Sequence, residues 1–277
     1  MKLASYIANG KPAFGVVMGD RVATIEGRYA TLKDFLASRA LDEVRKKIAS
    51  ANPDHDLKGL KFLPVITNPN KILCVGINYR SHAAEHGHVV AEKPNIFTKF
   101  ADTLCGHGGE MVRPKASTQL DFEGELAVII GKGGRAIERN DALSHVAGYT
   151  CFCDGSVRDF IKVSLVTGKN FPSTSPLGPW MVTADEIPDP SKLTLTTRLN
   201  GVQMQHSGTD MMMYDVPMLM AYCSAFTELT PGDVIATGTP EGIGARRNPP
   251  VWMKSGDVLE VEISQIGTLR CRVIDER

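Results

Sequence analysis

Short apolar runs rich in β-branched residues, each ended by a turn-forming residue, constrain the fold of this chain most. Such runs occupy residues 71–75, 126–130, 193–197 and 258–263. Runs of this length between glycine, proline or asparagine are typical of β-strands. With 26 glycines and 16 prolines in 277 residues, the chain favours many short strands over long helices. We predict an α+β, mostly β fold. Helices are expected near residues 79–86, 155–166 and 216–227.

The first 65 residues have a pattern of their own. Alternating runs at residues 2–6, 14–18 and 21–25 are separated by glycine-containing turns and predict a small β-meander. Thr31 is placed to cap a helix whose apolar periodicity continues through Ile48. A polar, proline-containing stretch follows. We therefore predict a small β-rich N-terminal domain over residues 1–65 and a catalytic domain over residues 66–277.

Charge and apolar length exclude several classes of function. The 31 acidic residues balance the 31 basic ones, which argues against nucleic-acid binding by phosphate neutralisation. No apolar run approaches the roughly 20 residues of a membrane helix, and the N-terminus lacks the apolar core of a signal peptide. The 6 scattered cysteines are typical of reduced thiols. We expect a cytoplasmic protein that acts on small molecules, without nucleic-acid or membrane partners.

Glu123 and Glu125 form the strongest single signal of chemistry. They are two positions apart at the start of an apolar strand, so their side chains face the same way. Two neighbouring carboxylates repel each other unless a cation lies between them. An all-oxygen pair suits Mg²⁺, Mn²⁺ or Ca²⁺ rather than zinc. The alternative is a polar, solvent-facing strand end that binds nothing.

Asp154 is a third candidate carboxylate, followed four residues later by Arg158. At this spacing the two side chains share a helical face, so the arginine could reach a ligand held by the aspartate. Taken alone, the segment is better explained by an N-cap aspartate with an arginine as its surface partner.

His82 and Glu85 are three positions apart in a predicted helix, where a carboxylate can orient an imidazole for general-base work. The alternative is an incidental ion pair on an exposed helix. With His86 and His88 the segment could also form a histidine-rich metal patch, but no cysteine or remote histidine has a matching spacing. Further along, the turn at residues 237–242 could hold a carboxylate or phosphate, although a turn without ligand would look similar.

Taken together and in this order, the motifs resemble the fumarylacetoacetate hydrolase family over roughly residues 70–274. The matching segments are 76–79 with His82 and Glu85, 121–126, 154–159, 168–169, 178–180, 199–201 and 231–240. The resemblance implies the mixed β-sheet roll of that family, a homodimer, and the small N-terminal domain of its bacterial members.

The same resemblance implies a role for each candidate residue. One Mg²⁺ or Mn²⁺ would be held by Glu123, Glu125 and Asp154. The implied catalytic residues are His82, Glu85 and Lys169, with the first two on a segment over the substrate. The implied substrate contacts are Tyr79, Arg158 and Thr239.

The activity implied is that of a metal-dependent hydrolase that cleaves a C–C bond of an acylpyruvate, a 2,4-diketo acid, in aromatic or sugar-acid catabolism. An oxaloacetate-type decarboxylase or a 2-hydroxy-dienoate isomerase would use the same platform, and the motifs do not choose among them. A non-catalytic metal- or ligand-binding relative is the alternative of another class. The chain departs from the family pattern at Cys153, Ile161 and Pro172, which makes the substrate-facing surroundings less polar.

Overall fold

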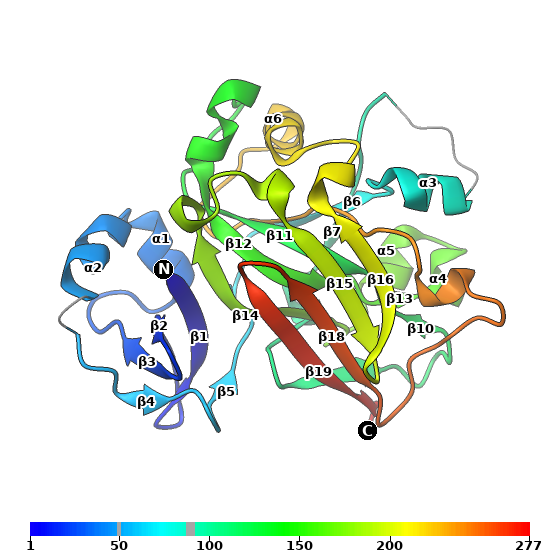
Figure 1. Ribbon diagram of the computed structural model, residues 1–277, viewed down its shortest axis with the longest axis horizontal. Coiled ribbons are helices and arrows are strands. Elements are labelled where there is room, and N and C mark those ends of the chain that lie inside the picture. The colour runs from blue at the N-terminus through cyan, green and yellow to red at the C-terminus, as the bar shows by residue number, and fades with distance from the viewer. Residues whose placement is uncertain (49–50, 87–91) are drawn as a thin grey trace.

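The computed structural model describes residues 1–48, 51–86 and 92–277 and is built around two packed β-sheets (Figure 1). Within these ranges, the larger sheet has the order β4 (His55–Asp56), β3 (Arg21–Thr24), β2 (Lys11–Met18), β1 (Lys2–Ala8), β14 (Ser175–Thr183), β12 (Val146–Cys153), β11 (Gly124–Ile130), β17 (Val234–Ala236), β6 (Ile72–Gly76) and β7 (Asn95–Lys99). Two short strands join it from the side: β5 (Lys61–Phe62) pairs with β1, and β8 (Leu104–Cys105) pairs with β14.

The second sheet packs against the larger one. Its order is β16 (Val202–Gly208), β15 (Thr194–Leu199), β18 (Val258–Ile263), β19 (Gly267–Asp275) and β9 (Glu110–Arg113). A separate pair is formed by β10 (Leu120–Asp121) and β13 (Ser156–Val157). The α-helices are α1 (Leu32–Ala37), α2 (Leu41–Ile48), α3 (Arg80–His86), α4 (Arg158–Ile161), α5 (Leu165–Lys169) and α6 (Val216–Phe226). Short 3₁₀ helices span Ala101–Thr103, Arg139–His145, Ala184–Glu186, Pro190–Lys192, Thr209–Met211 and Gly244–Arg246.

The predicted mostly β fold is confirmed, while two predicted helices are divided. The helix expected to run from Thr31 to Ile48 ends at Ala37, because Arg39 adopts a left-handed backbone with φ 57°. Thr31 caps α1 as predicted, in a reciprocal capping box with Asp34. The helix expected near 155–166 is replaced by β13, α4 and α5.

The N-terminal segment extends the larger sheet. β1 pairs antiparallel with β14, with Leu3 opposite Met181 and Lys2 opposite Val182. Its strands lie beside the main body at the left of Figure 1. The predicted meander of β1, β2 and β3 is present, and its edge-to-edge pairing makes it continuous with the rest of the sheet. The domain boundary near residue 65 stays a prediction.

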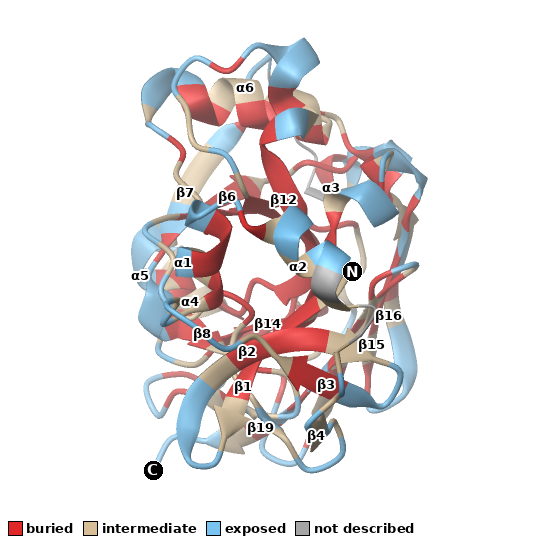
Figure 2. Cartoon of the chain, turned by 90° about the vertical axis from the view of Figure 1, so that its left-hand side faces the viewer, coloured by how far each residue is buried: buried red, intermediate tan, exposed pale blue. Residues whose placement is uncertain are grey.

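β11 is buried on both of its faces. Leu126, Val128 and Ile130 pack into the core between the two sheets, whereas Ala127 and Ile129 pack into a second core under α1. This alternation follows from the two-residue period of a strand. Figure 2 shows the same burial along β12 and β14, with exposed residues on the outer sides of the helices. The central strands are therefore rigid supports for whatever their ends carry.

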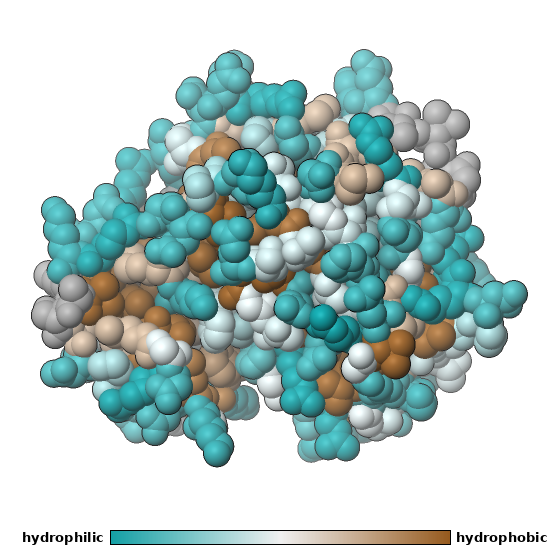
Figure 3. Space-filling model, viewed as in Figure 1, coloured by the Kyte–Doolittle hydropathy of each residue, from teal (hydrophilic) through white to brown (hydrophobic). Residues whose placement is uncertain are grey.

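The face seen in Figure 3 is mostly hydrophilic, with hydrophobic residues in separate groups, one of them over the N-terminal segment at the left. Apolar residues scattered in this way are usual on a protein surface. Within the described ranges, no helix has the length and apolar character needed to cross a bilayer.

His107 gives the fold a defined pH dependence. Its Nδ1 accepts a hydrogen bond of 3.1 Å from the Arg270 N–H, and its ring meets Phe62 edge to face. Burial, and then the charge of Arg270, lower the pKa of His107. In the unfolded chain, His107 takes up a proton near pH 6.5, whereas in the folded chain it does so only at a lower pH. The free energy of unfolding therefore falls as the pH drops below about 6.5.

His107→Asn keeps an acceptor for the Arg270 N–H but cannot titrate. We expect its free energy of unfolding to fall less steeply than that of the unchanged protein between pH 7 and pH 5, as measured by urea unfolding. Equal slopes for the two proteins would contradict this role of His107.

Candidate active site

Three buried carboxylates meet where β11 begins and β12 ends. The antiparallel register puts Gly124 opposite Cys153, so Glu123 and Asp154 lie next to each other, joined by a 2.8 Å hydrogen bond from the Asp154 N–H to the Glu123 carbonyl. Glu125 follows on the same face as Glu123. One ligand oxygen from each carboxylate lies within 4.8 Å of the others. The sheet pairing therefore assembles the three predicted metal ligands.

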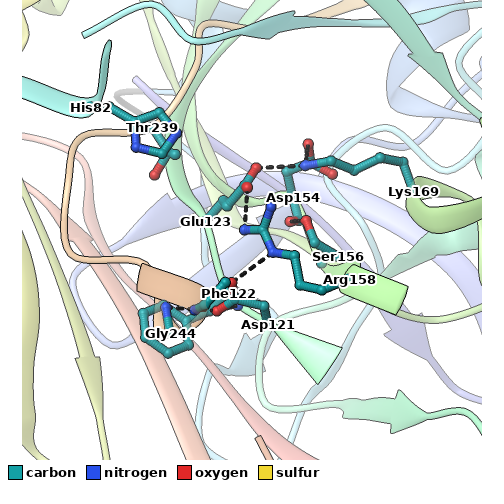
Figure 4. A network of polar contacts seen from close by, with 12 residues as sticks. His82, Asp121, Phe122, Glu123, Asp154, Ser156, Arg158, Lys169, Thr239 and Gly244 are labelled. Atoms are coloured by element: carbon teal, nitrogen blue, oxygen red, sulfur yellow. Dashed lines mark hydrogen bonds and ion pairs between the residues drawn. The ribbon is translucent and has the colours of Figure 1, made fainter. Parts of the chain in front are cut away.

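Lysines and an arginine surround this cluster unevenly (Figure 4). Lys169 Nζ lies 2.5 Å from Glu123 Oε2 and 2.6 Å from Asp154 Oδ2, and Arg158 Nη2 lies 2.5 Å from Glu123 Oε1. Burial alone would raise the pKa of Glu123, but Lys169 and Arg158 outweigh it and hold that pKa below its usual range. Glu123 is thus charged and fully paired.

Glu125 has no comparable compensation. Its Oε2 accepts a 2.8 Å hydrogen bond from the Gly238 N–H. Burial, together with the charges of Asp154 and Glu123, raises the pKa of Glu125 well above its usual range. In addition, Asp154 Oδ1 lies 2.8 Å from Lys99 Nζ but outside hydrogen-bond geometry. A hard divalent cation would offset the repulsion felt by the Glu125 carboxylate and would give Asp154 Oδ1 a partner. The donor set therefore fits such a cation.

Arg158 is held by Asp121, a residue for which the sequence predicts no role. Asp121 Oδ2 accepts a 2.7 Å bond from Arg158 Nε, and the two carboxylate oxygens also accept from the N–H groups of Phe122, Gly244 and Ala245. This fixes the guanidinium with its other end on Glu123. Asp154 is not the N-cap considered from the sequence, since α4 begins after Val157.

Lys99 was also missed. Its side chain, at the end of β7, is 0% exposed. The ammonium lies beside Asp154 and donates to the carbonyls of Gly155 and Lys169. Two of the three donors of the lysine are thus used in hydrogen bonds, and its charge lies beside Asp154. A lysine that ends an alternating strand carries no local sequence signal of such a role, because its partners are remote along the chain.

His82 and Glu85 form the predicted pair on α3. His82 Nδ1 lies 2.9 Å from Glu85 Oε2, and Glu85 Oε1 accepts a 3.2 Å bond from the Gly242 N–H. Ser81 also bonds to Glu241. The helix is therefore tied to the 237–242 turn. His88 of the alternative histidine patch, and the side chain of His86, lie outside the described residues.

Thr239 stands in the same turn and is fixed by a buried glutamine. Its hydroxyl donates to the Gly124 carbonyl at 2.8 Å and accepts from Gln205 Nε2 at 2.8 Å. Gln205 Oε1 in turn accepts from the Gly124 N–H at 3.0 Å. The turn is thereby joined to the first residue of β11. This role of Gln205 could not be predicted from the sequence.

A cavity of about 260 Å³ lies over the carboxylates. It is lined by Val75, Gly76, Ile77, His82, Asn95, Phe97, Glu123, Glu125, Arg158, Ile161, Leu165, Lys169 and Thr239. In Figure 4, His82 and Thr239 lie on one side of Glu123 and Lys169 on the other. Glu85 and Asp154 do not line the cavity themselves but contact residues that do: Glu85 contacts His82, and Asp154 contacts Lys169. Tyr79 is placed elsewhere: it is 0% exposed within the core, and its hydroxyl has no hydrogen-bond partner in the described part of the chain.

The three departures noted in the sequence differ in their location. Ile161 lines the cavity, whereas Cys153 packs in the core between the sheets and Pro172 is exposed. Only the first therefore bears directly on the bound molecule.

Residues 71–274 match the family model described as fumarylacetoacetate (FAA) hydrolase C-terminal. The mitochondrial oxaloacetate tautomerase FAHD2A of Bos taurus is 39% identical over 250 residues, which cover 88% of this chain and 80% of that protein. The structure of maleylpyruvate hydrolase from Sphingobium sp. SYK-6, in complex with manganese (II) ion and pyruvate, has a TM-score of 0.85 at 29% identity and covers 100% of both chains. That of 5-carboxymethyl-2-hydroxymuconate delta-isomerase from Mycobacterium smegmatis has a TM-score of 0.79 at 30% identity, also with 100% of both chains covered. The chain is thus similar to proteins named for three different reactions.

Gly124→Ala tests how tightly the cluster is built. A Cβ at residue 124 would overlap Thr197 Oγ1, a hydroxyl without a hydrogen-bond partner in the described residues. We expect a loss of about 1–3 kcal/mol in the free energy of unfolding. Thr197→Ala should restore most of it in the double variant, because it removes the overlapping atom. Additive losses in a urea-unfolding cycle would refute this explanation.

Metal binding should stabilise the fold through the carboxylate cluster. With Mn²⁺ at 100 times its Kd, we expect a gain of about 2.7 kcal/mol in the free energy of unfolding, reversed by a chelator. Glu125→Gln should reduce this gain strongly. Asp233→Asn is the matched control: it breaks the ion pair of the buried Asp233 with the half-buried Lys71 (3.0 Å) and should lower the baseline stability while keeping the Mn²⁺-induced gain. Equal gains in both variants would exclude Glu125 as a ligand.

Proposed function

The chain belongs to the fumarylacetoacetate hydrolase family, and we propose that it is a divalent-metal-dependent enzyme that interconverts the enol and keto forms of a small 2-oxo acid of the oxaloacetate class. One observation carries the proposal: Glu123 and Glu125 of the carboxylate cluster line the same small cavity as His82, which Glu85 orients. The 39% identity with a protein named oxaloacetate tautomerase supports it.

Glu123, Glu125 and Asp154 would hold the cation, Mg²⁺ or Mn²⁺. When bound, it supplies a Lewis acid that offsets negative charge on the oxygens of a 2-oxo acid. The protein side chains supply the remaining charges: the Lys169 ammonium and the Arg158 guanidinium both border the cavity at its acidic end.

Tautomerisation needs one proton moved from oxygen to carbon. In the direction from enol to keto, the C2 hydroxyl loses its proton, the C2–O bond becomes a carbonyl, and C3 gains a proton, so nothing is consumed. His82, oriented by Glu85, would give or take the proton at C3. The Lys169 ammonium would face the C2 oxygen and lower the cost of charge there.

Hydrolysis of an acylpyruvate, the activity first expected from the sequence, is the second candidate. His82 would take a proton from water, the hydroxide would add to the C4 carbonyl, and the C3–C4 bond would break to leave a carboxylic acid and a pyruvate enolate that gains a proton. The fold shared with maleylpyruvate hydrolase favours it. A non-catalytic relative is disfavoured because a binding protein does not need the oriented His82–Glu85 pair. Homodimeric assembly and a cytoplasmic location stay predictions.

His82→Ala tests the base. We expect metal-dependent loss of oxaloacetate enol absorbance to slow by roughly 10²–10⁴-fold, because a positioned proton-transfer group is lost, with Mn²⁺ affinity by calorimetry unchanged. His55→Ala, in the N-terminal segment, is the matched control and should keep full activity. Pyruvate release from acetylpyruvate, measured in parallel, separates tautomerase from hydrolase. Undiminished activity of His82→Ala would rule out His82 as the base.

A further inference from the structure

Two unlike sets of side chains line the cavity. One set is charged or carries a hydroxyl: His82, Glu123, Glu125, Arg158, Lys169 and Thr239. The remaining lining residues are Gly76, Asn95 and five apolar residues, Val75, Ile77, Phe97, Ile161 and Leu165, whose side chains we call the apolar wall. This wall comes from the end of β6, from β7 and from the α4–α5 segment.

The apolar wall reaches the reactive end of the cavity. Lys169 Nζ, the amine between Glu123 and Asp154, lies 5.2 Å from the centre of the Phe97 ring. Phe97 therefore lies directly beside the group that would face the substrate oxygen. An ammonium over an aromatic face is favourable and needs no water between them.

Ile161 is fixed in the apolar wall by its packing. A Cβ at Gly168, the residue before Lys169, would overlap the side chain and backbone of Ile161, so the two residues are in close contact. The rings of Phe160 and Phe171 pack edge to face at 5.0 Å and hold α4 against the segment after α5. Ile161 thus has little freedom to leave the neighbourhood of Lys169.

A water molecule against the apolar wall would have few partners, since Asn95 is the one polar side chain that β6 and β7 add to the lining. Ordered water in a protein makes two to four hydrogen bonds, and the five side chains of the apolar wall offer none. Two polar groups elsewhere in the lining already have protein partners: Arg158 bonds to Asp121 and Glu123, and Thr239 bonds to Gly124 and Gln205.

We propose that the apolar wall keeps hydrolytic water from the reaction centre. Ile161 would thereby favour tautomerisation over hydrolytic cleavage of the C–C bond. This inference rests on the proposed function. Beside the apolar wall, protonation of the enolate at C3 gives the keto acid, and an acylpyruvate in that keto form keeps its C3–C4 bond because no water is held where it could add to the C4 carbonyl.

Ile161→Gln introduces an amide of similar size into the apolar wall, and Ile161→Leu is the apolar control. Two rates are measured with Mn²⁺-loaded protein: loss of oxaloacetate enol absorbance and release of pyruvate from acetylpyruvate. We expect the ratio of hydrolysis to tautomerisation to rise at least about tenfold in Ile161→Gln and to change less than about twofold in Ile161→Leu. Mn²⁺ affinity should stay the same, since Ile161 is not a ligand.

The outcomes separate the inference from the proposed function. An unchanged ratio in a folded, Mn²⁺-binding Ile161→Gln overturns the inference and leaves the function intact. Hydrolysis by the unchanged protein as fast as its tautomerisation overturns it as well. Absence of any metal-dependent tautomerisation in the unchanged protein overturns the proposed function itself. If Ile161→Gln does not fold, Leu165→Asn places an amide in the same wall. A rise in its ratio of hydrolysis to tautomerisation supports the inference, and an unchanged ratio overturns it.

Discussion

The antiparallel pairing of β11 with β12 is the constraint on which the site depends. It places Asp154, which follows one strand, against Glu123, which precedes the other, and it does so through backbone hydrogen bonds that side-chain repulsion cannot easily break. Both strands are buried on their two faces, so the ends that carry the acids are held by the cores of the whole molecule. The acidic cluster is therefore imposed on the site by the sheet.

Burying four carboxylates in one region is costly unless cations accompany them. Three of the acids, Asp121, Glu123 and Asp154, have an arginine or lysine as partner, drawn from α4, α5 and β7. Arg158 and Lys169 belong to α4 and α5, so their ion pairs also hold these two helices against the central sheet. Removing one partner of such a pair typically costs about 3–5 kcal/mol, because the other charge is left buried.

Features that depend on local periodicity could be predicted from the sequence, whereas few that depend on long-range pairing could. The shared face of Glu123 and Glu125, the His82–Glu85 spacing and the cap at Thr31 all depend on residues within four positions, and each is present. Asp154 joined the metal ligands only through the family resemblance, since the segment alone favoured an N-cap. Lys99 and Gln205 were missed because their partners lie 55 and 81 positions away, at Asp154 and Gly124. Tyr79 was expected at the substrate, but its side chain is 0% exposed in the core and is not among the residues that line the cavity.

The double attachment of α3 to the 237–242 turn has a consequence for how the enzyme would cycle. Glu85 uses one carboxylate oxygen to orient His82 and the other to bind the Gly242 N–H, so a single side chain both aligns the base and secures the helix. Departure of α3 from the turn would take the histidine out of alignment in the same movement. The position of the base relative to the carboxylate cluster therefore depends on the same turn that carries Thr239, and a change in that turn would be felt at His82 through Glu85.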